Sequence, residues 1–90
     1  MTHNYIYIND FSTDNICDII EKFIKDLSVG FRTTKAITFI SYNFIYMDLN
    51  VTIKYDNKYI VIIYDKPDGE IYNDNVYEKL IELKDILEKI

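Results

Sequence analysis

The chain has 90 residues, of which 49% are hydrophobic, and its formal net charge at neutral pH is −5. This length predicts a single domain over residues 1–90, and the hydrophobic content excludes an intrinsically disordered chain. The negative charge argues against a protein that binds nucleic acid mainly through phosphate contacts. A single cysteine excludes an internal disulfide bond. The sequence lacks a leader-like N-terminus and a membrane-length apolar run, so we expect a cytoplasmic protein with no membrane partner.

The first part of the chain predicts a strand, a helix and a second strand. The segment "YIYI" at 5–8 has the alternation of a short strand. Apolar residues then recur every three or four positions from Ile16 to Leu27, the spacing of a helix with one buried side. Gly30 follows, at a position where helices commonly end. We expect the next strand over about 36–42.

The segment "FIYMDLNVTIKY" at 44–55 alternates almost without interruption and predicts one long strand. Its core face would comprise Ile45, Met47, Leu49, Val51, Ile53 and Tyr55. Phe44 and Tyr46 would lie on the opposite, outward face. Asp56 and Asn57 follow as the residues of a hairpin turn.

The run "KYIVIIYD" is apolar on both faces and predicts a central strand over 59–64. "KPDG" at 66–69 predicts a turn, and residues 70–72 could add a short strand. The last helix would begin at Asn73 or Asp74. Its buried stripe would comprise Val76, Leu80, Leu83, Leu87 and Ile90.

These elements follow one another in the order β-α-β-β-β-α and predict an α+β fold. Two one-sided helices and an antiparallel sheet of three or four strands fit best as a two-layer sandwich. Both helices would pack on one face of the sheet. The other face would be open to solvent or to a partner.

The chain lacks the side-chain sets on which most enzymes depend. We expect its one histidine, His3, ahead of the first strand, and its one cysteine, Cys17, at the edge of the helical apolar stripe. The acidic turn that follows Asp65 has Pro67 where a calcium loop needs an oxygen ligand. No nucleophile triad or glycine-rich phosphate loop occurs. We therefore expect no enzyme activity, no cofactor and no metal site.

Carboxylates gather in two rows near the C-terminus. The first row surrounds the predicted turn and comprises Asp65, Asp68, Glu70 and Asp74. The second row has the spacing i, i+4, i+7, which places its members on one helix face, and it comprises Glu78, Glu82 and Asp85. A solvated helix face is an alternative reading of the second row. Either row could attract a partner with a basic surface.

Nine tyrosines are many for a chain of this length. They either fill ordinary aromatic strand positions, in a composition typical of AU-rich codons, or act as anchors of an interface. The candidate anchors are Phe44, Tyr46 and Tyr64. With Ile60 and Ile62 they would form an outward apolar patch that something should cover.

In size, charge and AU-rich composition the chain resembles toxin-immunity proteins and phage-encoded anti-defence proteins such as anti-CRISPRs. This favours a small acidic inhibitor that occludes the basic nucleic-acid-binding or nuclease site of a partner protein. One alternative is a homodimeric scaffold or chaperone-like module joined through the open sheet face. Another is a double-stranded-RNA-binding-like domain, which has a similar element order. The acidic start of the last helix, "NDNVYEKL", disfavours direct contact with nucleic acid.

Overall fold

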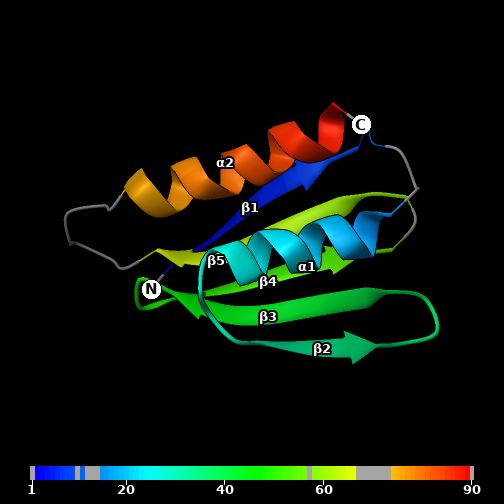
Figure 1. The fold of residues 1–90 in the computed structure, drawn as a ribbon, viewed down its shortest axis with the longest axis horizontal. Coiled ribbons are helices and arrows are strands. Elements are labelled where there is room, and N and C mark those ends of the chain that lie inside the picture. The colour runs from blue at the N-terminus through cyan, green and yellow to red at the C-terminus, as the bar shows by residue number, and fades with distance from the viewer. Residues whose placement is uncertain (1, 10, 12–14, 57, 67–73, 90) are drawn as a thin grey trace.

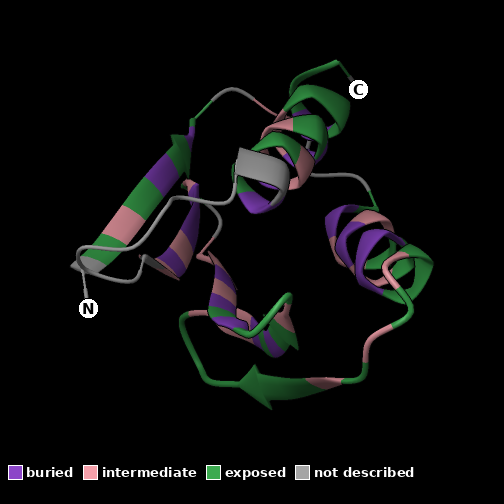
Figure 2. Cartoon of the chain, turned by 90° about the vertical axis from the view of Figure 1, so that its left-hand side faces the viewer, coloured by how far each residue is buried: buried purple, intermediate pink, exposed green. Residues whose placement is uncertain are grey.

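The computed structural model describes residues 2–9, 11, 15–56, 58–66 and 74–89. Its elements are β1 (Thr2–Ile8), α1 (Ile16–Asp26), β2 (Phe31–Lys35), β3 (Ile40–Tyr46), β4 (Leu49–Tyr55), β5 (Ile60–Lys66) and α2 (Asp74–Glu88). The strands form one antiparallel sheet in the order β1-β5-β4-β3-β2. Both helices lie on one face of this sheet (Figures 1 and 2). The α+β class is confirmed, but the sheet has five strands instead of three or four.

The additional strand is β2, and residues 44–55 form a hairpin between β3 and β4 instead of one long strand. Met47 and Asp48 have φ angles of 51° and 65°, and two consecutive positive values are typical of a type I′ hairpin turn. Tyr46 and Leu49 are partners on either side of this turn. The prediction of one long strand was wrong because Met-Asp lacks the usual Asn-Gly or Asp-Gly turn signal, while the apolar alternation continues through it.

The turn reverses which residues of β3 face the helices. Tyr42 and Phe44 point into the core and are 1% and 3% exposed, whereas Ile45 lies on the opposite face and is 64% exposed. The predicted core position of Ile45 was therefore wrong, and so were the predicted outward positions of Phe44 and Tyr46, since Tyr46 lies on the helix-covered face and packs against the core. In β4, Val51 and Ile53 are buried as predicted.

Strand β2 occupies a segment that the sequence assigned to a connection. The strand expected over 36–42 does not begin at Ala36, whose N–H instead donates to the carbonyl of Phe39 at 2.9 Å in the turn between β2 and β3. β2 reads "FRTTK" and is largely exposed, so it lacks the apolar alternation that identifies a strand. Its first residue, Phe31, packs edge-on against Tyr42, with ring centroids 5.9 Å apart.

The core lies between the sheet and the helices. The helices contribute Ile16, Ile20, Phe23, Ile24, Val76, Leu80, Leu83 and Leu87. The strands contribute Ile6, Ile8, Tyr42, Phe44, Leu49, Val51, Ile53, Ile60, Ile62 and Tyr64. The α2 stripe agrees with the prediction over its described length, and Ile90 lies outside it. Ile60, Ile62 and Tyr64 were expected on the outward face and are instead part of this core.

The second hairpin, between β4 and β5, lies where the sequence predicts one. Asp56 closes it: its carboxylate Oδ1 accepts hydrogen bonds from the backbone N–H groups of Lys58 and Tyr59, both at 3.0 Å. Asn57 and the segment 67–73, which contains the predicted turn and the possible short strand, lie outside the described residues. In the part of the chain that the structure describes, no helix combines the length and apolar character needed to cross a membrane.

Candidate functional site

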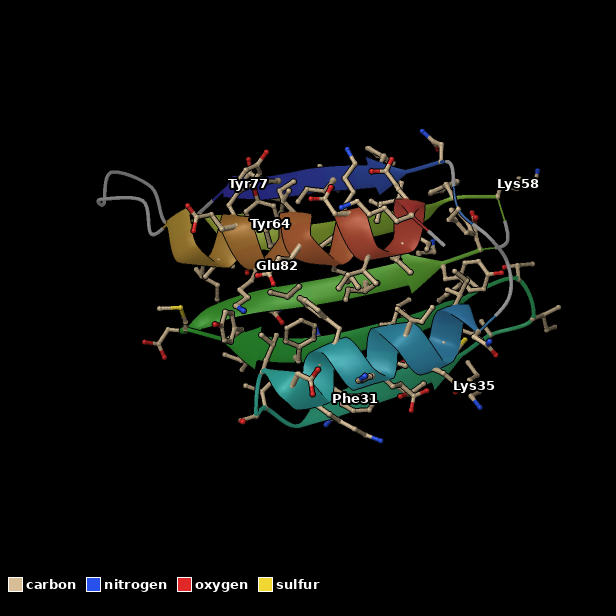
Figure 3. The ribbon with its side chains drawn as sticks, turned by 45° about the horizontal axis from the view of Figure 1, so that its top comes forward. Phe31, Lys35, Lys58, Tyr64, Tyr77 and Glu82 are labelled. Atoms are coloured by element: carbon tan, nitrogen blue, oxygen red, sulfur yellow. The ribbon has the colours of Figure 1, made fainter. Side chains whose placement is uncertain are left out.

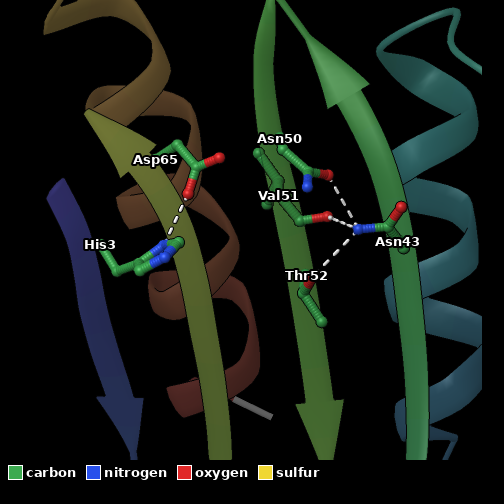
Figure 4. A network of polar contacts seen from close by, with 6 residues as sticks. All are labelled: His3, Asn43, Asn50, Val51, Thr52 and Asp65. Atoms are coloured by element: carbon green, nitrogen blue, oxygen red, sulfur yellow. Dashed lines mark hydrogen bonds and ion pairs between the residues drawn. The ribbon is translucent and has the colours of Figure 1, made fainter. Parts of the chain in front are cut away.

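The first predicted acidic row is represented by one described side chain. Asp65 lies on β5, and its Oδ1 is 2.7 Å from Nδ1 of His3 on β1 (Figure 4). His3 thus belongs to a strand, whereas the sequence placed it ahead of one. Asp68, Glu70 and the side chain of Asp74 lie outside the described residues. The Asp65 side chain is only 16% exposed and already has a partner, so it is poorly placed to meet a second protein.

The second predicted row lies on α2, and Glu78, Glu82 and Asp85 are all exposed there. Two of the three line a groove of about 280 Å³ between α2 and the β3–β4 turn. The lining residues are Tyr46, Met47, Glu78, Lys79 and Glu82. Figure 3 shows Glu82 on the side of α2 that faces α1. Asp85 is exposed one turn further along but does not line the groove, so the structure divides this row.

The groove combines two kinds of surface. Tyr46, the last residue of β3, and Met47, which is 46% exposed, supply apolar area with an aromatic ring. The carboxylates of Glu78 and Glu82 flank this area from α2. The fold therefore joins one predicted aromatic anchor, Tyr46, with two predicted carboxylates that lie more than thirty positions away in the sequence.

The turn that carries Met47 is strained. Left-handed backbone costs an L residue about 1–2 kcal/mol, and glycine or asparagine normally occupies such positions. Met47 and Asp48 both adopt it. Strained residues persist where surrounding structure holds them and are frequent at functional sites. This strained turn places the long apolar side chain of Met47 in the lining of the groove.

Lys79 moderates the negative charge of the groove. Its Nζ is 3.2 Å from Oε2 of Glu82, and the two side chains are 44% and 59% exposed. Exposed pairs of this kind contribute about 0–1 kcal/mol to stability, so Lys79 is easily displaced. Glu78 and Glu82 are spaced i, i+4, where like charges repel weakly. With two carboxylates and one ammonium group the groove is negative overall.

The other two predicted anchors are not on the surface. Phe44 and Tyr64 are 3% and 5% exposed and belong to the core. The expectation that they form an outward patch was wrong, because the assumed faces of both strands are reversed. A side chain that is buried to this degree offers almost no area to a partner.

A second polar cluster links α1 to the sheet beneath it. The hydroxyl of Tyr42 donates a hydrogen bond to Oε2 of Glu21 at 3.1 Å. Burial raises the pKa of the Tyr42 phenol well above its usual value, and the neighbouring Cys17 thiol and Glu21 carboxylate raise that pKa further. The phenol stays neutral and donates, so this cluster fastens α1 to β3.

The open face of the sheet is polar and aromatic. The Nδ2 group of Asn43 on β3 reaches three acceptors on β4: Asn50 Oδ1 at 2.9 Å, Thr52 Oγ1 at 3.0 Å and the Val51 carbonyl at 3.2 Å (Figure 4). A larger hollow of about 650 Å³ lies beside the β2–β3 border, and Arg32 is its one ionisable lining residue. Within the described residues, no group of three or more His, Cys, Asp or Glu side chains is placed to hold a metal ion.

Comparisons with protein-family models, with curated proteins and with solved structures gave no match to this chain. The groove is therefore interpreted from its own geometry.

Sequence reasoning missed Met47 and Lys79. Met47 was assigned to the core because the turn after Tyr46 was not recognised. Lys79 had a usable signal, since it precedes Glu82 by three positions, the spacing of neighbouring side chains on a helix.

Proposed function

We propose that the protein is a small acidic binding protein that inhibits a partner by holding a basic side chain of that partner in the groove lined by Tyr46, Met47, Glu78, Lys79 and Glu82. The observation that carries this proposal is the placement of two carboxylates beside the partly buried Tyr46 ring and the exposed Met47 thioether. The partner class expected from the sequence, a nuclease or another nucleic-acid-binding protein, has basic side chains at its functional surface. A carboxylate pair there would take the place of a phosphate.

The chemistry of the groove suits arginine or lysine. Both have a long apolar stem that packs on surfaces such as Met47 and Tyr46, and a cationic head that needs anionic acceptors. A guanidinium group can also stack on an aromatic ring and bind a carboxylate through two parallel hydrogen bonds. Glu78 has no ion-pair partner among the described side chains, so its carboxylate is available.

Binding of a partner cation requires Lys79 to release Glu82. The Lys79–Glu82 pair is exposed and weak, whereas a guanidinium between two carboxylates makes stronger, charge-assisted hydrogen bonds. Replacing Lys79 by Ala should therefore strengthen binding of a cationic ligand, while replacing either glutamate by Gln should weaken it. These opposite signs distinguish the groove from a general acidic surface.

A direct test uses the methyl resonance of Met47. The chain contains two methionines, so methyl labelling of methionine gives a simple spectrum with one reporter in the groove. We expect N-acetyl-arginine amide to shift the Met47 signal and the uncharged isostere N-acetyl-citrulline amide to leave it unchanged. Equal responses to the two compounds, or no response at millimolar concentration, would refute the groove as a cation site.

The inhibitory role is tested with the natural partner. Immobilised wild-type protein, E78Q/E82Q and D85N are compared for capture of proteins from the source cell, followed by assay of the captured protein for nucleic-acid binding. We expect D85N to retain the partner and E78Q/E82Q to lose it, with affinity reduced roughly tenfold or more because charged hydrogen bonds are removed. Asp85 is the matched control, since it is an exposed acid of the same helix outside the groove. Retention by all three proteins would contradict the proposal.

A further inference from the structure

The two edge strands of the sheet, β1 and β2, differ in how well they are protected against pairing with a strand of another chain. β2 has five residues and includes Arg32 and Lys35. β1 has seven residues, reads "THNYIYI", and contains no proline and no Lys, Arg, Asp or Glu. It pairs with β5 without a bulge from Thr2 to Ile8. An edge strand that is neither short, charged nor interrupted can pair with another strand through its unpaired backbone N–H and C=O groups.

The side chains of β1 on the open face favour such pairing. Tyr5 and Tyr7 are each 55% exposed. Their rings lie 6.3 Å apart with planes only 18° from parallel. Tyrosine pairs well across neighbouring strands and is enriched at interfaces.

Helix α2 continues this surface in the second layer. Its side towards α1 includes Ile86, which lines a hollow with α1 residues. Since α-helical residues are about 100° apart, the opposite side carries Tyr77, Ile81, Lys84 and Glu88. Tyr77 is 42% exposed. This flank lies towards β1, because α2 contacts α1 on one side and β1 on the other. The positive charge of Lys84 and the negative charge of Glu88 make the flank neutral overall.

We propose that β1 pairs with β1 of a second copy of the chain, antiparallel and about a two-fold axis at Tyr5, so that the two sheets become one continuous sheet. A second copy fits because the border is neutral and self-complementary. Full overlap of the seven-residue strands places Tyr5 opposite its own copy and Tyr7 opposite His3. In the helical layer, the two-fold axis brings this flank of α2 against the same flank of the second copy, and each flank carries one positive and one negative charge. The acidic groove stays free, since Glu78 and Glu82 lie on the other side of α2.

Sedimentation equilibrium over about 10 μM to 1 mM, a range in which association of micromolar strength is resolved, tests this proposal with three lysine variants. Y5K places two like charges face to face at the two-fold axis and should weaken dimerisation roughly tenfold or more. T34K adds the same charge to the exposed border strand β2 and should leave dimerisation unchanged. I45K charges the open face at a residue that is 64% exposed and should also have no effect. Circular dichroism shows that each variant is folded.

A charge-swap experiment tests the register. Y5K and Y5E are each expected to self-associate more weakly than the wild type, and their equimolar mixture should form a one-to-one heterodimer more tightly than either variant self-associates, because opposite charges then meet at the axis. Three results would overturn the proposal: a wild-type protein that stays monomeric throughout, a dimer that resists Y5K, or a Y5K and Y5E mixture that does not associate. A dimer that I45K disrupts and Y5K does not would be joined face to face and would also overturn it.

Discussion

The two faces of the sheet carry similar residue types, but these side chains are exposed to different degrees. On the helix-covered face, Tyr42 is 1% exposed and its hydroxyl has a fixed acceptor in Glu21. On the open face, Tyr5 and Tyr7 remain 55% exposed. Val61 nevertheless reaches 5% exposure on that open face, beside its cross-strand neighbour Tyr7. Helices cover one face. On the open face, amphipathic side chains such as Tyr7 shield the apolar residues at the centre, so this face is stable in water without a partner.

The largest difference between the faces should appear when equivalent isoleucines are shortened. Ile53 lies on the helix-covered face and is fully buried, whereas Ile63 lies on the open face and is partly exposed. We expect Ile53→Ala to lower the free energy of unfolding by about 3–4 kcal/mol, because a cavity forms among packed side chains, and Ile63→Ala by about 1 kcal/mol. Urea denaturation measures both. Equal losses would mean that the open face is packed like a core.

Alkaline unfolding should also separate the faces. The pKa of Tyr42 is raised by burial and then by Cys17 and Glu21, so the neutral phenol contributes stability that is fully present below its unfolded pKa of 10.0 and is lost as pH rises above it. Each pH unit in that range removes about 1.4 kcal/mol. Denaturation curves between pH 8 and pH 11, a range spanning the tyrosine pKa, measure the loss.

The control for the alkaline experiment is Tyr42→Phe. This variant should be about 1 kcal/mol less stable at neutral pH, since its hydrogen bond to Glu21 is missing. It should lose less stability than the wild type as pH rises. An identical alkaline slope in the two proteins would show that Tyr42 does not govern the transition.

The β3–β4 turn decides which residues lie on each face, and its strain should be measurable. Replacing Met47 by Asn and Asp48 by Gly supplies the residues that a type I′ turn favours. We expect the double variant to raise the free energy of unfolding by about 1–2 kcal/mol, because both replaced residues have positive φ. Thermal denaturation measures the gain. The same variant should bind N-acetyl-arginine amide more weakly, measured from the backbone amide signals of Glu78 and Glu82 because the Met47 methyl is absent. A stabilised variant that bound the compound as well as the wild type would argue against a role for Met47.

The smallest effect should come from the contact between His3 and Asp65 on the open face. His3 and Asp65 are 2.7 Å apart, but the His3 side chain is 64% exposed. We expect His3→Gln and Asp65→Asn each to change stability by less than about 1 kcal/mol. A double-mutant cycle isolates their coupling. A coupling well above that range would make this pair a structural element of the β1–β5 border.

The sequence predicts the features that depend on strong periodicity. The stripes on α1 and α2, the hairpin near Asp56 and the apolar strand β5 all follow from local pattern. The exposed acids Glu78 and Glu82 follow as well, since helical spacing assigns them to one face. These features need only neighbours in sequence.

The remaining features depend on one unrecognised turn and on long-range packing. Met47 and Asp48 give no turn signal, and once they are read as strand the faces of Phe44 and Ile45 exchange. Strand β2 was missed because it is a largely exposed edge strand, and its residues do not alternate between apolar and polar. The groove could not be predicted, since it forms where α2 passes the β3–β4 turn, and that meeting depends on the packing of the whole chain.

The contacts among tyrosine rings have a consequence for spectroscopy. The chain contains no tryptophan, so its intrinsic fluorescence comes from tyrosine alone. The Tyr5 ring lies 6.3 Å from that of Tyr7, which lies 6.0 Å from that of Tyr59. Excitation energy therefore passes among these rings, and emitted light loses its polarisation faster than tumbling alone would cause. The polarisation of tyrosine fluorescence is therefore a label-free signal from β1, the strand that would contact a second copy directly.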